Sequence, residues 1–172
     1  MTDRGTFVEH DGRPAVRFER TYRQPVERLW AAITEPGDLS HWFPSKVVLE
    51  PRVGGKIEFS GDPHGTSMTG EVLAYEPPHR LAYTWGGDEL HFALTAAGDG
   101  CTLTLINVLE ARDTAARNAA GWDVCLAELT KHLADEVADG PHSETSEPWR
   151  PLYDGYVAAG MPSGAWFPEN AR

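Results

Sequence analysis

The feature that most constrains this fold is a change of hydrophobic period near residue 114. Before it, short runs such as Leu81, Tyr83 and Trp85 alternate apolar with polar residues, and glycine or proline turns separate the runs. After it, apolar residues recur at helical spacing. Strands this close in sequence pair antiparallel, because parallel pairing needs a crossover of a dozen or more residues. We therefore predict a strand meander followed by one long helix.

The opening segment adds a strand and two short helices. Residues 15–22 alternate like a half-buried strand, and Pro36-Gly37 ends the helix that follows it. That helix has one apolar face, made of Val26, Leu29, Trp30 and Ile33. Leu39, Trp42 and Phe43 indicate the second short helix. The predicted class is α+β: a curved antiparallel sheet of about seven strands, with the long helix covering one face.

We predict the long helix over residues 114–138. Its apolar stripe consists of Trp122, Leu126, Leu129, Leu133 and Val137. Its other face carries charged residues that we expect to meet water, namely Asp123, Glu128, Lys131, Asp135 and Glu136. Such a helix buries one side against a sheet, and the space between the two layers is a natural place for a cavity.

The chain divides into a domain at residues 13–138 and a proline-rich extension at residues 139–172. The extension holds five aromatic residues: Trp149, Tyr153, Tyr156, Trp166 and Phe167. Leaving such side chains in water is costly, since burying each one stabilises a fold by about 1.5–3 kcal/mol. We expect a short helix near residues 151–159 and an ordered extension, docked on its own domain or on the partner chain of a homodimer.

Composition excludes several partners. The formal net charge of the 172 residues is −11, so phosphate backbones and anionic lipid surfaces are repelled, and neither nucleic acid nor membrane is an expected partner. No secretory signal or membrane-spanning run is apparent, and the only cysteines, Cys101 and Cys125, are too few for a disulfide scaffold. These features indicate a cytoplasmic protein with free thiols.

Candidate catalytic and metal sites are weak. The seven histidines are scattered without a close ligand pair, and no nucleophile elbow or phosphate loop is present. We therefore expect no catalytic residue, metal or cofactor. Asn107 lies in phase with Leu103 and Leu105, so it points inward and must be hydrogen-bonded, either as a structural tie or as a ligand contact.

Several short motifs together resemble a known superfamily. They are Phe18, Arg20, Pro25, Val26, Trp30, Ile33 and Thr34; Leu39, Trp42 and Phe43; Gly54-Gly55; Gly70, Val72, Glu76, Pro77, Pro78, Leu81, Tyr83 and Trp85; and Gly121-Trp122, Leu126, Leu129 and Leu133. In order and spacing they resemble the START-like, or SRPBCC, superfamily, which includes the birch-pollen allergen. The nearest branch is the domain of homologues of the activator of the 90-kilodalton heat-shock protein ATPase. The resemblance covers about residues 13–138 and implies a helix-grip fold with a hydrophobic-ligand cavity.

The expected function is binding of a small hydrophobic or aromatic molecule in an apolar cavity between sheet and helix. The predicted lining comprises Trp30, Trp42, Phe43, Tyr83, Trp85, Phe92, Leu94, Asn107, Trp122, Leu126 and Leu129. Two alternatives stay open: a cyclase- or aromatase-type enzyme using the same cavity, and a chaperone-linked interaction module, which would need an exposed apolar patch. The absence of an acid–base pair in the sequence favours a binding protein over an enzyme.

Overall fold

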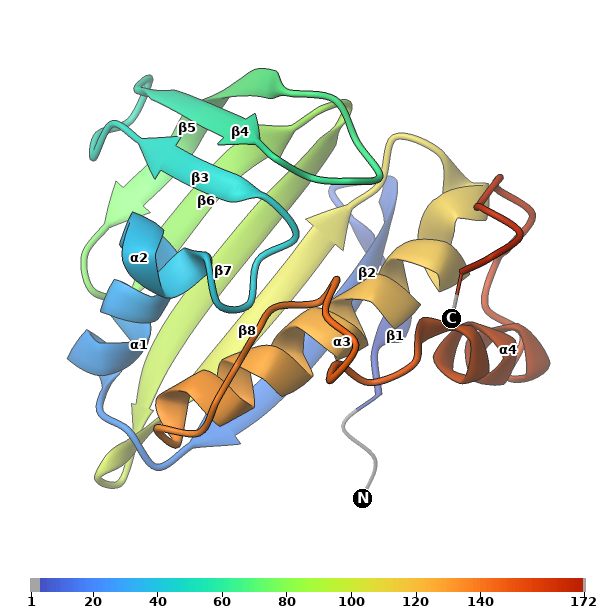
Figure 1. Cartoon of the computed structure of the whole chain (residues 1–172). Helices are drawn as coiled ribbons and strands as arrows, with labels where there is room; N and C mark the ends of the chain where they lie inside the picture. Colours follow the sequence, from blue (N-terminus) through green and yellow to red (C-terminus); the bar gives the residue numbers. More distant parts are fainter. Residues whose placement is uncertain (1–3, 172) are drawn as a thin grey trace.

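The computed structural model describes residues 4–171. Its eight strands form one antiparallel sheet in the order β1-β2-β8-β7-β6-β5-β4-β3. The strands are β1 (Thr6–His10), β2 (Arg13–Tyr22), β3 (Lys46–Leu49), β4 (Lys56–Ser60), β5 (Met68–Glu76), β6 (Arg80–Trp85), β7 (Asp88–Ala97) and β8 (Gly100–Val108). The sheet is strongly curved, and its concave face wraps the longest helix (Figure 1). The α+β helix-grip prediction is confirmed, with one strand more than expected.

The helices are α1 (Val26–Thr34), α2 (Pro36–Leu39), η1 (Arg112–Thr114), α3 (Ala115–Leu133) and α4 (Trp149–Ala158). Helices α1 and α2 follow β2 and lie at one end of the concave face, while α3 crosses it (Figure 1). The second helix lies earlier than predicted: it begins at Pro36, which suits a first helical position, and ends at Leu39, so Trp42 and Phe43 lie in the turns after it. The coil of residues 134–148 runs back along α3, and α4 packs beside the N-terminal half of α3 (Figure 1). No helix within residues 4–171 has the length and apolar character needed to cross a membrane.

The extra strand is β1, at the edge of the sheet. It joins β2 through Asp11 and Gly12, whose φ angles of 49° and 80° are the left-handed values that a two-residue hairpin turn requires. The Asp-Gly dipeptide is the sequence signal for this turn. The polar composition around it hid a strand whose residues are only half-buried or exposed.

Aromatic rings fill much of the space between the sheet and its helices. Trp42 and Phe92 meet edge to face at 6.4 Å, and Tyr83 lies 5.7 Å from Phe59 and 5.9 Å from Phe92. The indole N–H of Trp42 donates to the Ala32 carbonyl, so this ring also fixes α1. The centre of the domain is therefore a packed core.

Helix α3 ends earlier than predicted. It stops at Leu133, and Asp135 takes a left-handed φ of 59°, which terminates the helix. Val137, expected to continue the apolar stripe, is 79% exposed. The stripe itself is correct from Trp122 to Leu133, because all four of those residues are buried.

The expectation that Asp123 and Glu128 face water is wrong. Both are buried, because α4 and the coil of residues 134–148 cover the outer side of α3. The Asp123 carboxylate accepts hydrogen bonds from Arg20 and from the Tyr156 hydroxyl, and Glu128 pairs with Lys131 at 2.6 Å and accepts the N–H of Gly140. Buried carboxylates need such partners, and here the partners hold the extension in place.

Candidate functional site

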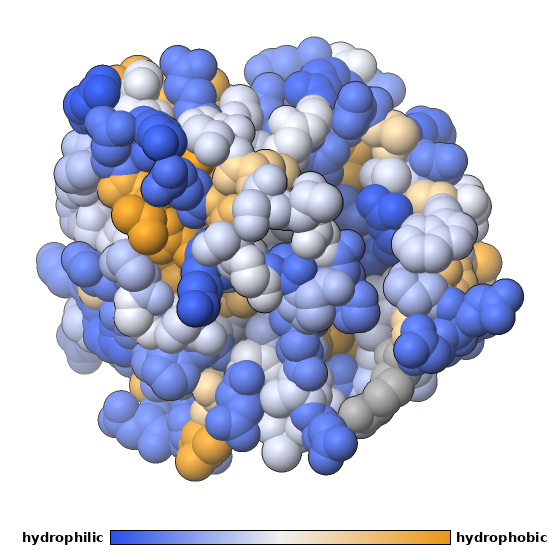
Figure 2. All heavy atoms as spheres, turned by 45° about the horizontal axis from the view of Figure 1, so that its top comes forward, coloured by the Kyte–Doolittle hydropathy of each residue, from blue (hydrophilic) through white to orange (hydrophobic). Residues whose placement is uncertain are grey.

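A cleft of about 950 Å³ opens between α3, the loop joining β4 to β5, and the C-terminal extension. We call it the α3 cleft. Helix α3 contributes Arg117, Asn118, Gly121, Trp122, Val124 and Cys125 to the lining, and β6 contributes Trp85. The extension supplies a wall from residues 141–149 and 166–171. The face of the molecule shown in Figure 2 is mainly hydrophilic, with apolar residues in separate areas.

Five aromatic side chains form the apolar part of the α3 cleft: Trp85, Trp122, Trp149, Trp166 and Phe167. The rings of Trp85 and Trp122 lie 5.4 Å apart, and Phe43 packs edge-on behind both of them. On the opposite wall, Trp149 stacks on Tyr153 at 4.9 Å and contacts Phe167. Trp166 is 78% exposed. The cleft therefore has two rigid aromatic walls and one exposed ring beside them.

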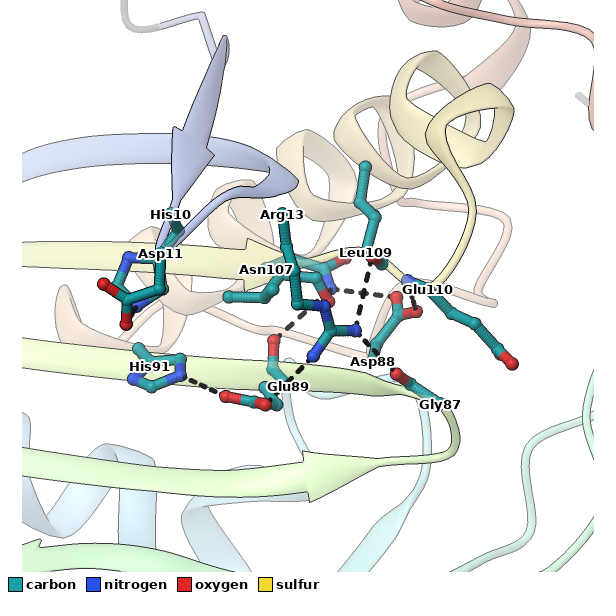
Figure 3. A network of polar contacts seen from close by, with 11 residues as sticks. His10, Asp11, Arg13, Gly87, Asp88, Glu89, His91, Asn107, Leu109 and Glu110 are labelled. Atoms are coloured by element: carbon teal, nitrogen blue, oxygen red, sulfur yellow. Dashed lines mark hydrogen bonds and ion pairs between the residues drawn. The ribbon is translucent and has the colours of Figure 1, made fainter.

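A hydrogen-bond network fixes the Trp122 wall from behind. The Trp122 indole N–H and the Asn118 side-chain amide both donate to Oδ1 of Asn107, at 3.0 and 3.1 Å. Asp88 accepts from Asn107 through Oδ2 and from the backbone N–H of Glu110 through Oδ1 (Figure 3). Oδ2 of Asp88 also accepts from the side-chain amide of Asn118. Asn107 is fully buried and satisfied, so it acts as the structural tie that was one of its two predicted roles.

A second polar cluster lies beside this network but does not line the α3 cleft. Glu89 pairs with Arg13 at 3.0 Å and with His91 at 2.8 Å, and Arg13 also donates to the carbonyls of Gly87 and Leu109 (Figure 3). The His10 ring lies 4.9 Å from that of His91. These contacts join the β1–β2 hairpin to β7, so we assign this cluster a structural role.

Two histidines and a carboxylate face one another where the β4–β5 loop meets the extension. The rings of His64 and His142 are 5.3 Å apart, and Oδ1 of Asp62 lies 3.6 Å from Nε2 of His142. Nε2 of His142 also contacts the Pro44 carbonyl at 2.9 Å, and since a carbonyl only accepts, this nitrogen carries the proton. The three side chains line the α3 cleft and connect two of its walls.

The family model described as activator of Hsp90 ATPase homolog 1-like protein matches residues 23–134, from the end of β2 through α3. The chain belongs to this family. The extension that forms one wall of the α3 cleft lies outside the matched residues. No curated protein matches the chain.

Solved structures share the fold of this family member. CalU16 from Micromonospora echinospora is 21% identical with a TM-score of 0.67, covering 94% of this chain and 96% of CalU16. EF2215 from Enterococcus faecalis, a conserved protein of unknown function, is 21% identical with a TM-score of 0.72, covering 90% and 89%. DynU16, from the dynemicin biosynthetic locus, is 24% identical with a TM-score of 0.64, covering 73% of this chain and 50% of DynU16.

Of the residues predicted to line a cavity, Trp85 and Trp122 line the α3 cleft. The others do not. Trp42, Phe43, Tyr83, Phe92, Leu94, Leu126 and Leu129 are buried in the core, Asn107 lies behind Trp122, and Trp30 packs half-buried against Tyr75. Inward direction could be predicted from strand and helix period, but whether inward rings meet or leave space depends on the curvature of the sheet.

Burial controls the reactive groups of this core. The Tyr83 hydroxyl has no hydrogen-bond partner among residues 4–171, and burial raises the pKa of this phenol far above its usual range. Cys125 borders the α3 cleft, yet burial also raises the pKa of its thiol, which therefore stays protonated and is a poor nucleophile. Within the described residues no group of three or more His, Cys, Asp or Glu side chains is placed to hold a metal ion.

Sequence reasoning missed two parts of the cleft, namely the β4–β5 loop and the position of the extension. The loop gives no signal, because Asp62 and His64 look like any solvated turn. The extension does give one, since its aromatic residues predict docking. Its docking surface is the outer side of α3, where the indole N–H of Trp149 donates to the Arg117 carbonyl.

Proposed function

We propose that this protein binds a small hydrophobic or aromatic molecule in the α3 cleft. The observation that carries the proposal is a cleft of about 950 Å³ whose walls present five aromatic side chains beside a few polar groups. Ligand sites typically have about 300–1,000 Å³ of space, apolar walls and a small number of placed polar groups. The α3 cleft has each of these properties.

Preorganisation supports the same proposal. The Trp122 wall is fixed by Asn107, and the Trp149 wall by stacking and by the Arg117 carbonyl. Rigid aromatic walls lose little side-chain entropy when a ligand docks, so more of the contact energy remains as affinity. Trp166 is the exception, because its ring is exposed and is not fixed by packing on both sides.

A second candidate is a cyclase-type enzyme using this cleft. His64, His142 and Asp62 favour it, because imidazoles beside an aromatic-walled cleft can move protons on a bound molecule. The fold shared with DynU16, from a biosynthetic locus, is consistent with either role. Conversion of the bound molecule by wild type, lost in His142→Ala with binding retained, would favour the enzyme.

Native mass spectrometry of protein purified from its own host tests the proposal. We expect a mass increment that disappears on denaturation and belongs to a hydrophobic or aromatic molecule. Gly121→Leu, which projects a bulky side chain into the cleft, should purify without the increment. A ligand retained equally by this variant would place binding elsewhere and contradict the proposal.

A further inference from the structure

The guanidinium of Arg117 stands out among the groups that line the α3 cleft. Most described arginines face a carboxylate, as Arg13 faces Glu89 and Arg28 faces Asp38. Arg117 forms no ion pair with any carboxylate of residues 4–171, although the chain has 26 acidic and 15 basic side chains. An unpaired, part-buried guanidinium at an aromatic cleft lacks the counter-charge that such a group normally finds.

Arg117 is held in position by neutral acceptors. Its Nε–H donates to Oδ1 of Asn118 at 3.2 Å, and Nη1 donates to the Trp166 carbonyl at 3.1 Å. Asn118 is in turn fixed by Asp88 and Asn107. Since a guanidinium has five N–H donors, these two contacts leave donors for a ligand. The group is oriented without being neutralised.

The two carboxylates that line the cleft do not face Arg117 within ion-pair distance. Oδ1 of Asp62 accepts the backbone N–H of His64 and lies beside His142. Glu147 is exposed. The positive charge of Arg117 therefore has no internal partner in the cleft.

We propose that the ligand of the α3 cleft is an amphipathic monoanion, a hydrophobic or aromatic acid whose carboxylate or sulfonate pairs with Arg117. The proposal rests on the proposed function, since it names the chemical class that the same site selects. The apolar body lies between the Trp122 and Trp149 walls, and the anionic group takes the free guanidinium donors in a charge-assisted contact. A single cation suits one negative charge better than a phosphate dianion.

A matched pair of fluorescent probes tests this inference. Anilinonaphthalene sulfonate is anionic, and N-phenylnaphthylamine has the same ring system without the sulfonate. We expect Arg117→Gln to lower the affinity for the anionic probe about tenfold and to leave the affinity for the neutral probe unchanged. Arg117→Lys should restore part of the loss. The control is Arg52→Gln, an exposed arginine outside the cleft, which should change neither affinity.

Salt provides a readout that needs no variant. Raising the salt concentration should lower the affinity of wild type for the anionic probe. Its affinity for the neutral probe should stay the same or rise slightly. If Arg117→Gln lowers the affinity for both probes equally, Arg117 is a structural group and the inference is overturned. An unchanged affinity for the anionic probe in this variant would also overturn it. Neutral-probe binding without anionic-probe binding would overturn it while keeping the proposed function. Failure of both probes to bind wild type would contradict the proposed function itself.

Discussion

The indole N–H of Trp122 donates to the side-chain oxygen of Asn107 at 3.0 Å, joining the long helix to the end of β8. Both residues are buried, and the same oxygen also accepts from Asn118. This contact positions one aromatic wall of the α3 cleft relative to the sheet. The wall therefore depends on a polar tie inside the core.

Asn107→Leu should destabilise the protein by about 2–4 kcal/mol, because it leaves the Trp122 N–H and the Asn118 amide without their shared acceptor. Urea unfolding measures the change. Thr104→Val, on the opposite face of the same strand, is the matched control and should shift stability by less than about 0.5 kcal/mol. A loss no larger than the control's would show that Asn107 is not the tie.

Tyr156→Phe should loosen the attachment of the extension. The Tyr156 hydroxyl donates to the buried Asp123 carboxylate and accepts the N–H of Gly5, so its loss removes two contacts at about 1–3 kcal/mol in total. Burial, and then the contact with Asp123, raise the pKa of this phenol, so it stays protonated throughout the neutral range.

Tyr153→Phe on the same helix is the control, since no hydrogen bond of the Tyr153 hydroxyl is found within residues 4–171. We expect faster chymotryptic cleavage after Trp149 in Tyr156→Phe and unchanged cleavage at that site in Tyr153→Phe. Equal resistance of both variants would mean that the hydroxyl does not hold α4. Size-exclusion chromatography of the same variants tests the alternative that the extension contacts the partner chain of a homodimer, in which case Tyr156→Phe should shift the protein toward the monomer.

The ionisation of Asp38 should make the stability of the protein depend on pH in the acidic range. Burial alone would raise its pKa, but hydrogen bonds from His132 and Arg28 outweigh burial, and the pKa of this carboxyl lies below its usual value. The facing charged and titratable groups are Arg28 on α1, His132 on α3 and His41, whose ring stacks on His132. A lowered folded pKa adds stability above the unfolded pKa of about 3.9, which is lost as the pH falls below it.

The measurement is urea unfolding of wild type and Asp38→Asn at pH 7, 5 and 3. Wild type should be the more stable of the two at pH 7 and 5. The difference in unfolding free energy between wild type and Asp38→Asn should become smaller at pH 3. Asp139→Asn, in the coil that follows α3, is a control that should show no such trend. A gap that stays constant down to pH 3 would contradict the assignment.

Most of the fold was predictable from local pattern. Alternation located the strands from β2 to β8, and proline and glycine located their ends. The edge strand β1 was missed because its half-exposed residues hardly alternate, although Asp11-Gly12 marked its turn. The end of α3 was misplaced because Val137 continues the helical spacing on a segment that has already turned away.

The site was less predictable, for two physical reasons. Inward-facing rings such as Trp42 and Phe92 fill space as readily as they line it, and the pattern is the same in both cases. The α3 cleft also depends on residues distant in sequence, since Arg117 meets the Trp166 carbonyl only once the extension has docked. The burial of Asp123 and Glu128 has the same cause. The docked extension covers the charged face of α3, which the sequence pattern predicts to be exposed to solvent.

Gly121 allows the most direct test of the claim that the α3 cleft binds a ligand. It lines the cleft from within α3, and a Cβ atom added there meets no atom within 4 Å. Gly121→Leu therefore projects a bulky side chain into the cleft beside Trp122 and should also stabilise the helix by up to about 1 kcal/mol. Gly155, in α4 and outside the lining, is equally open, so Gly155→Leu is the matched control.

The measurement is a fluorescence titration of the three proteins with the neutral probe N-phenylnaphthylamine. We predict saturable binding with tryptophan quenching in wild type and Gly155→Leu, and at least tenfold weaker binding in a fully folded Gly121→Leu. Unchanged binding by Gly121→Leu, or no saturable binding by wild type, would contradict the claim that the α3 cleft is the ligand site.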